Sequence, residues 1–140
     1  MKKVWLVVVT VVMLGGFLVT TANAAQLCWQ VDSTNDLLDG YINATVSGGK
    51  LTRAVHGGYY AQGGLYFPMA GNMVKSPDDS KWYLQLNTNL FDSYVGMLIT
   101  LNASTLSGAG NLIVIADDRN VYSQTFTNIS CKALPAPTSP

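Results

Sequence analysis

The sequence predicts an all-β domain, and three observations point to that class. Glutamate is absent from the 140 residues, and no stretch after residue 25 carries helix-forming residues at the helical period. Apolar and polar residues alternate with period two in several segments, which is the pattern of half-buried strands. The only two cysteines, Cys28 and Cys131, lie near opposite ends of the segment that follows residue 24. We therefore expect about eight strands, connected as a meander and closed into a small up-and-down barrel.

Turn signals and alternation define the first four predicted strands, at 26–32, 40–47, 51–60 and 64–75. In the first strand, Trp29 shares a face with the apolar residues two places before and after it, and Cys28 lies on the opposite face. In the second strand, Ile42 belongs to a similar alternation. A polar loop follows the first strand, and Gly-Gly pairs lie in the hairpin-like turns after the second and third strands.

The other four strands are predicted at 81–88, 93–103, 107–116 and 121–131. A Ser-Pro-Asp-Asp turn precedes the fifth strand, in which Trp82 begins an apolar alternation, and Val95 begins a similar one in the sixth. An Asp-Asp-Arg-Asn turn connects the last two strands. The Pro-rich tail, 133–140, cannot join a sheet, so we place a single folded domain at 25–132.

The two cysteines favour a barrel over a β-sandwich, which is the alternative architecture. If Trp29 and Phe126 face the interior, alternation directs Cys28 and Cys131 outward. A disulfide between these cysteines then requires the first and last strands to be neighbours, as they are in a closed meander. The architecture resembles the small up-and-down barrels of the lipocalin and avidin kind. Lipocalins carry a glycine two places before the first-strand Trp, where this chain has Leu27, so no family residues are transferred.

Residues 1–24 have the three parts of a secretion signal. Lys2 and Lys3 precede an apolar run, and Ala22-Asn23-Ala24 fits a cleavage site. The apolar run, about 16 residues, is shorter than the roughly 20 that cross a bilayer. We expect cleavage after Ala24, no stable membrane span afterwards, and a periplasmic or secreted location of the bacterial type. Cys28 and Cys131 are expected to pair in that oxidising compartment.

The charge pattern argues against nucleic-acid binding. After residue 24, all eight acidic residues remain but Lys2 and Lys3 are lost from the eight basic ones, giving a net charge of about −2. The remaining basic residues are scattered, whereas a phosphate backbone requires a clustered stripe. No motif predicts a cofactor. No metal site is predicted either, because the Asp-rich stretch 32–40 lacks the EF-hand spacing.

Catalysis is also disfavoured. His56 is the only residue whose ordinary pKa lies near neutrality, and its sequence neighbours supply no nucleophile. The aspartate pairs at 78–79 and 117–118 lie in predicted turns, where Asp is common for its local hydrogen bonds. We expect a protein that is not an enzyme. A hydrolase that pairs His56 with an aspartate is the least favoured alternative.

The candidate ligand-binding residues are mostly aromatic and lie largely around the Gly-rich connection between the third and fourth strands. They are Tyr59, Tyr60, Tyr66, Phe67, Trp82 and His56. Alternation places some of them inside the barrel and others outside, where they serve either a ligand or a small core. The leading hypothesis is a small apolar or amphipathic ligand bound at the barrel mouth or interior. The alternative is a structural, interaction or inhibitor protein that contacts a partner through outward aromatic residues.

Overall fold

The computed structural model describes residues 24–90 and 92–134. The predicted signal segment lies outside these ranges except for Ala24, and so does the part of the Pro-rich tail at 135–140. Within the described ranges, no helix has the length and apolar character that crossing a bilayer requires.

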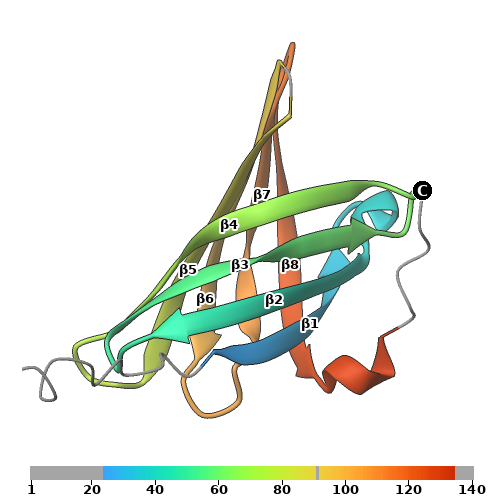
Figure 1. Ribbon diagram of the computed structural model, residues 1–140. Coiled ribbons are helices and arrows are strands. Elements are labelled where there is room, and N and C mark those ends of the chain that lie inside the picture. The colour runs from blue at the N-terminus through green and yellow to red at the C-terminus, as the bar shows by residue number, and fades with distance from the viewer. Residues whose placement is uncertain (1–23, 91, 135–140) are drawn as a thin grey trace, which may run out of the picture.

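Eight antiparallel strands form a closed barrel, which confirms the predicted fold class (Figure 1). The strands are β1 (Ala25–Ser33), β2 (Gly40–Gly48), β3 (Thr52–Ala61), β4 (Tyr66–Lys75), β5 (Lys81–Leu90), β6 (Ser93–Asn102), β7 (Gly108–Ile115) and β8 (Arg119–Ile129). Each strand pairs with its neighbours in sequence, and β1 also pairs with β8. In Figure 1, β1–β4 run across the picture, whereas β5–β8 run steeply through it. The two halves of the barrel wall therefore cross each other.

The disulfide between Cys28 and Cys131 lies at the seam where β1 meets β8. Cys28 is opposite Ile129 of β8, and the two cysteine Cα atoms are 5.2 Å apart, a separation that a disulfide readily spans. The predicted last strand extends to Cys131, but β8 ends at Ile129. Cys131 instead begins a short 3-10 helix, η2 (Cys131–Ala133), in which the Ala133 amide donates to the Ser130 carbonyl.

Large apolar side chains fill the barrel interior. Trp29, Tyr59 and Phe126 are the largest fully buried ones, and the Trp29 indole donates to the Leu106 carbonyl at 2.7 Å. The inward positions of β5 and β6 add Trp82, Leu84, Leu86, Val95, Met97, Ile99 and Leu101. A 3-10 helix between β1 and β2, η1 (Asp36–Leu38), contributes the buried Leu38. The interior is thus a packed core, as expected for a barrel of eight strands.

Glycines at inward positions allow neighbouring strands to approach closely. A Cβ added to Gly71 on β4 would collide with the Gln85 carbonyl of β5, and one on Gly57 of β3 would collide with the Asn43 carbonyl of β2. Glycine thus allows the close backbone approach at both positions, and such glycines help a sheet to coil into a barrel.

Candidate functional site

The six candidate residues separate onto the two faces of the barrel wall. Tyr59, Phe67 and Trp82 lie at inward positions, whereas His56, Tyr60 and Tyr66 lie on the outer face. The predicted alternation of aromatic residues is therefore confirmed. The structure pairs Tyr59 with Phe67 on the inner face and Tyr60 with Tyr66 on the outer face, so the six residues do not form one pocket.

Tyr59 is the centre of a small polar network inside the barrel. Its hydroxyl donates to the Leu38 carbonyl and accepts a hydrogen bond of 3.2 Å from the Gln124 amide. Burial raises the pKa of Tyr59 to about 12, although the hydrogen bond from Gln124 acts in the opposite direction. Phe67 stacks against Tyr59 with ring centroids 5.6 Å apart. The Oε1 atom of Gln124 is the one buried side-chain acceptor without a partner among the described residues.

Trp82 lies beneath two cationic side chains near the opposite end of the barrel. The Arg53 guanidinium carbon is 4.6 Å from the centre of the Trp82 ring, and the Lys75 Nζ is 5.8 Å from it. Lys75 also pairs with Asp79 at 2.9 Å. These contacts stabilise a packed barrel end through cation–π attraction. Trp82 itself is almost fully buried, so its ring offers little surface to a ligand.

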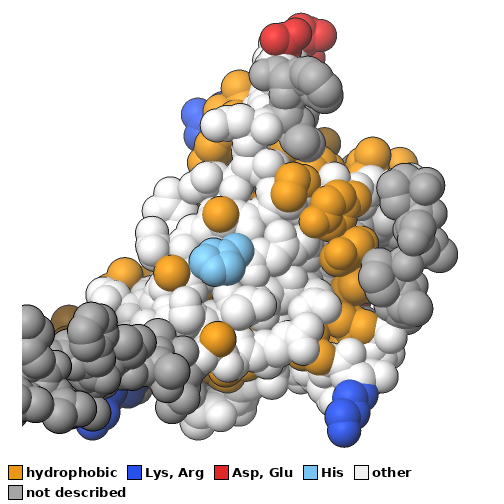
Figure 2. All heavy atoms as spheres, viewed as in Figure 1, with side chains coloured by type: hydrophobic (Ala, Val, Ile, Leu, Met, Phe, Trp, Pro, Cys, Tyr) orange, Lys and Arg blue, Asp and Glu red, His pale blue; other side chains and the backbone are white. Residues whose placement is uncertain are grey.

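Three tyrosines form a tyrosine ladder on the outer face of β2, β3 and β4. Tyr41 and Tyr60 stack with centroids 4.8 Å apart, and Tyr60 and Tyr66 lie 4.7 Å apart with tilted rings. Gly58 makes room for them, because a Cβ there would collide with the Tyr66 ring and crowd that of Tyr60. In Figure 2, hydrophobic side chains (orange) gather at the end of the outer face where β3 ends and β4 begins.

The structure does not place His56 in a catalytic arrangement. In Figure 2 it is the pale blue side chain on the outer face, and its strand neighbours are Thr45 and Ala70. Among the described residues, His56 forms no ion pair with an aspartate, and no three metal-binding side chains cluster together.

The side chain of Asp78 stabilises the turn before β5. Hydrogen bonds from Ser76 and Ser80 lower the pKa of Asp78 to about 2.

A groove on the outer face of β4–β8 and β1 is the main cavity feature that sequence reasoning missed; we call it the outer groove. It has a volume of about 1120 Å³. Its side chains form two rows that cross the strands. One row consists of Val74, Tyr83, Thr100, Ala109, Thr125 and Asp32, each opposite the next in strand register. The other consists of Asn72, Gln85, Leu98, Asn111 and Ser123.

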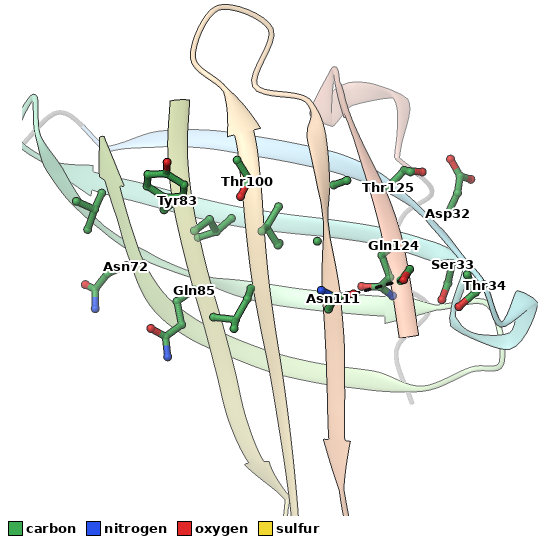
Figure 3. A pocket seen from close by; sticks show the side chains of 17 residues that line it. Asp32, Ser33, Thr34, Asn72, Tyr83, Gln85, Thr100, Asn111, Gln124 and Thr125 are labelled. Atoms are coloured by element: carbon green, nitrogen blue, oxygen red, sulfur yellow. Dashed lines mark hydrogen bonds between the residues drawn. The ribbon is translucent and has the colours of Figure 1, made fainter. Parts of the chain in front are cut away.

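The outer groove extends across six strands, so it is about 24 Å long at the usual strand spacing. Figure 3 shows Asn72, Tyr83 and Gln85 on one side and Thr125 and Asp32 on the other. These residues point outward because they alternate with buried ones; for example, Tyr83 and Gln85 flank the inward Leu84.

Small residues on β7 form the floor of the outer groove. Ala109 is the smallest member of its row, and the adjacent Gly110 also lines the groove. A Cβ on Gly110 would collide with the Leu98 carbonyl, so a glycine is needed for β7 to approach β6 as it does at this point. The larger Tyr83, Val74 and Leu98 stand toward one side, and they remain about half exposed.

The lining of the outer groove is nearly uncharged and rich in hydrogen-bonding groups. Asp32 is its one ionisable residue besides Tyr83, and it includes no Lys, Arg or His. Within the described part of the chain, Ser123 donates to Asn111 at 3.4 Å, whereas the side chains of Asn72, Gln85 and Thr100 make no internal hydrogen bond. Their donors and acceptors are therefore available to a ligand or to water.

No family model, curated protein or solved structure matches this chain. The outer groove residues left only a weak sequence signal. Many outward positions of β5–β8 carry amides and hydroxyls, for example Gln85, Asn111 and Thr125, whereas the charged Lys81 and Arg119 lie at strand ends. That pattern is visible in the sequence, but without the register its members cannot be assigned to one surface.

Proposed function

We propose that this protein is an exported, non-catalytic binding module whose ligand lies in the outer groove and is a neutral oligosaccharide. The observation that carries the proposal is the mixed lining: amides and hydroxyls in two rows, interspersed with apolar side chains and the half-exposed Tyr83 ring, and without a cationic side chain. A sugar chain offers hydroxyls to the amides and the apolar face of a ring to the tyrosine.

The filled interior supports a site outside the barrel rather than within it. Tyr59, Trp29 and Phe126 occupy the space that a ligand would need inside an eight-stranded barrel. An amphipathic ligand, which the sequence analysis predicted for the mouth or interior, is better matched to the outer groove.

The lining also distinguishes among ligand classes. A purely apolar ligand matches the apolar surface that makes up the larger part of the lining, but it offers no hydrogen-bonding partner to the side chains of Asn72, Gln85 and Thr100. A phosphate or nucleic acid is disfavoured by the absence of cationic side chains from the lining and by the carboxylate of Asp32. A linear polar peptide also offers hydrogen bonds, but it offers Tyr83 no regularly repeating apolar face.

The compartment supports the same proposal. The Cys28–Cys131 disulfide fits an oxidising environment such as the periplasm or the extracellular space. Residues 1–24 have the pattern of a cleaved signal, so the mature protein is proposed to begin at Ala25. Free oligosaccharides and glycan-coated surfaces are accessible to a protein in either place.

The test is titration of the exported protein with maltohexaose, cellohexaose and chitohexaose, followed by calorimetry and by amide chemical shifts. We expect at least one of them to bind and to shift resonances of the outer groove. Tyr83→Ala is expected to weaken that binding about fivefold, since an aromatic contact contributes about 1 kcal/mol.

Tyr66→Ala is the matched control, because it removes an equally exposed tyrosine from the tyrosine ladder, which lies on a different part of the outer barrel wall. It should leave the affinity unchanged. If none of the three sugars binds, while a linear Ser/Thr/Asn-rich peptide does and shifts the same resonances, the ligand class is wrong. If Tyr66→Ala abolishes sugar binding and Tyr83→Ala does not, the site is wrong.

A further inference from the structure

The tyrosine ladder leaves an apolar surface exposed at one end of the barrel. Tyr66 is 51% exposed. It lies four residues before Ala70, where the pairing of β4 with β5 begins, so β5 does not flank β4 at Tyr66. Leu65 and Leu37 at the same end are 49% and 66% exposed. Backbone contacts bring them close, since the Gly63 amide donates to the Leu37 carbonyl and the Ala61 amide to the Leu65 carbonyl.

The ladder is a preorganised surface. Tyr60 stacks between Tyr41 and Tyr66, and the rings of Tyr60 and Tyr66 lie over the space that Gly58 leaves open. Tyrosine side chains have few rotatable bonds, so fixing them against a ligand costs little additional conformational entropy. Such a surface suits an apolar segment that follows several rings in succession.

The chain itself supplies a segment of that kind. Residues 135–140 read Pro-Ala-Pro-Thr-Ser-Pro, without a charged side chain, and they lie outside the described residues. Sequences of this composition favour the polyproline II conformation, and aromatic-lined surfaces are the usual binding partners of that conformation.

The disulfide places this segment within reach of the ladder. From Cys131 the path runs 5.2 Å to Cys28, then about 5 Å across the strand pair to Asn43 and about 7 Å along β2 to Tyr41. Residues 135–140 extend about 19 Å in polyproline II, in addition to the three residues that connect them to Cys131. The segment can therefore span the ladder from Tyr41 toward Tyr66.

We propose that the Pro-rich segment 135–140 binds across the tyrosine ladder of its own chain. The disulfide tethers it beside the ladder, so binding is intramolecular and requires no high affinity for the separate peptide. The segment then covers the aromatic surface, and any partner for that surface must first displace it.

The test is nuclear Overhauser spectroscopy on the full exported protein. We expect contacts between proline ring protons of the segment and ring protons of Tyr60 and Tyr66. A variant with Pro135→Ser, Pro137→Ser and Pro140→Ser should lose these contacts and shift the tyrosine ring resonances. Thr138→Ala with Ser139→Ala is the matched control in the same segment, and it should retain them.

Two outcomes would overturn the proposal. One is the absence of proline–tyrosine contacts in the unsubstituted protein, or tyrosine resonances that the three proline substitutions leave unchanged. The other is contacts that appear only between differently labelled molecules in a mixed sample, because the occupant would then be a second copy of the chain. Neither result depends on sugar binding by the outer groove, which lies on a different part of the barrel wall.

Discussion

At the scale of single residues, the interior hydrogen bonds of Tyr59 predict that two substitutions differ in their effect on stability. We expect Tyr59→Phe to lower the free energy of unfolding by about 1–3 kcal/mol, because the Leu38 carbonyl and the Gln124 amide both lose a partner in a buried place. Gln124→Leu should cost less, since it also removes the unpartnered Oε1 atom. Urea unfolding of the two variants measures the difference, and a larger loss for Gln124→Leu would contradict this account.

The same hydroxyl predicts how stability changes in alkali. The pKa of Tyr59 is raised from 10.0 to about 12 in the folded protein, chiefly by burial. Above pH 10 the unfolded chain releases this proton while the folded chain retains it, so stability falls between pH 10 and about 12. Tyrosinate absorbance should show a titration step near pH 12 from Tyr59 in the folded protein, in addition to Tyr60, whose pKa burial also raises. That late step should be absent from Tyr59→Phe; if it persists, another tyrosine is responsible.

At the scale of elements, the outer face of β3 depends on one glycine. Gly58→Ala should displace the Tyr66 and Tyr60 rings, because its Cβ would collide with the first and crowd the second. We expect a reduced near-ultraviolet circular dichroism signal from tyrosine, with the strand signal in the far ultraviolet retained. Gly49→Ala is the control, since a Cβ there meets nothing closer than the Thr52 carbonyl at 3.9 Å. Equal spectra for the two variants would show that Gly58 does not determine how the rings of the tyrosine ladder are arranged.

The strands were predictable to within two residues at each end, whereas the site was not. Alternation around Trp29, Trp82 and Val95 is a local property, and turn residues mark where each alternation stops. The outer groove depends on which residues stand opposite one another across β4–β8, and on the close approach of β7 to β6 at Gly110. Neither follows from one strand alone. The alternation rule assigned Tyr59 and Tyr60 to opposite faces, but it could not identify Tyr41 as the third member of the ladder.

At the scale of the whole molecule, the disulfide should stabilise the barrel without determining its fold. In Cys28→Ser/Cys131→Ser, we expect the strand-rich spectrum to persist and the free energy of unfolding to fall by a few kcal/mol, up to about 4.7 in the chain-entropy estimate for a loop of this length. The 103-residue separation makes the constraint act mainly on the unfolded chain.

Hydrogen exchange locates the effect. Amide exchange should accelerate most in β1 and β8, whose pairing the disulfide secures at the seam. Reduction of the unsubstituted protein should reproduce the pattern. Faster exchange confined to β5 and β6, with β1 and β8 still protected, would mean that the seam is not the least stable junction of the barrel.

The position of the disulfide also decides how the molecule responds to mechanical tension. A force applied to the two ends passes from the first residues of β1 through the Cys28–Cys131 bond into η2, and it bypasses the strands between them. Oxidised protein stretched in an optical trap should therefore show almost no unfolding extension. After reduction, the 103-residue loop enters the force path and can lengthen the tether by about 350 Å. The covalent seam thus works as a mechanical bypass, which keeps the outer groove intact in a protein held at both ends.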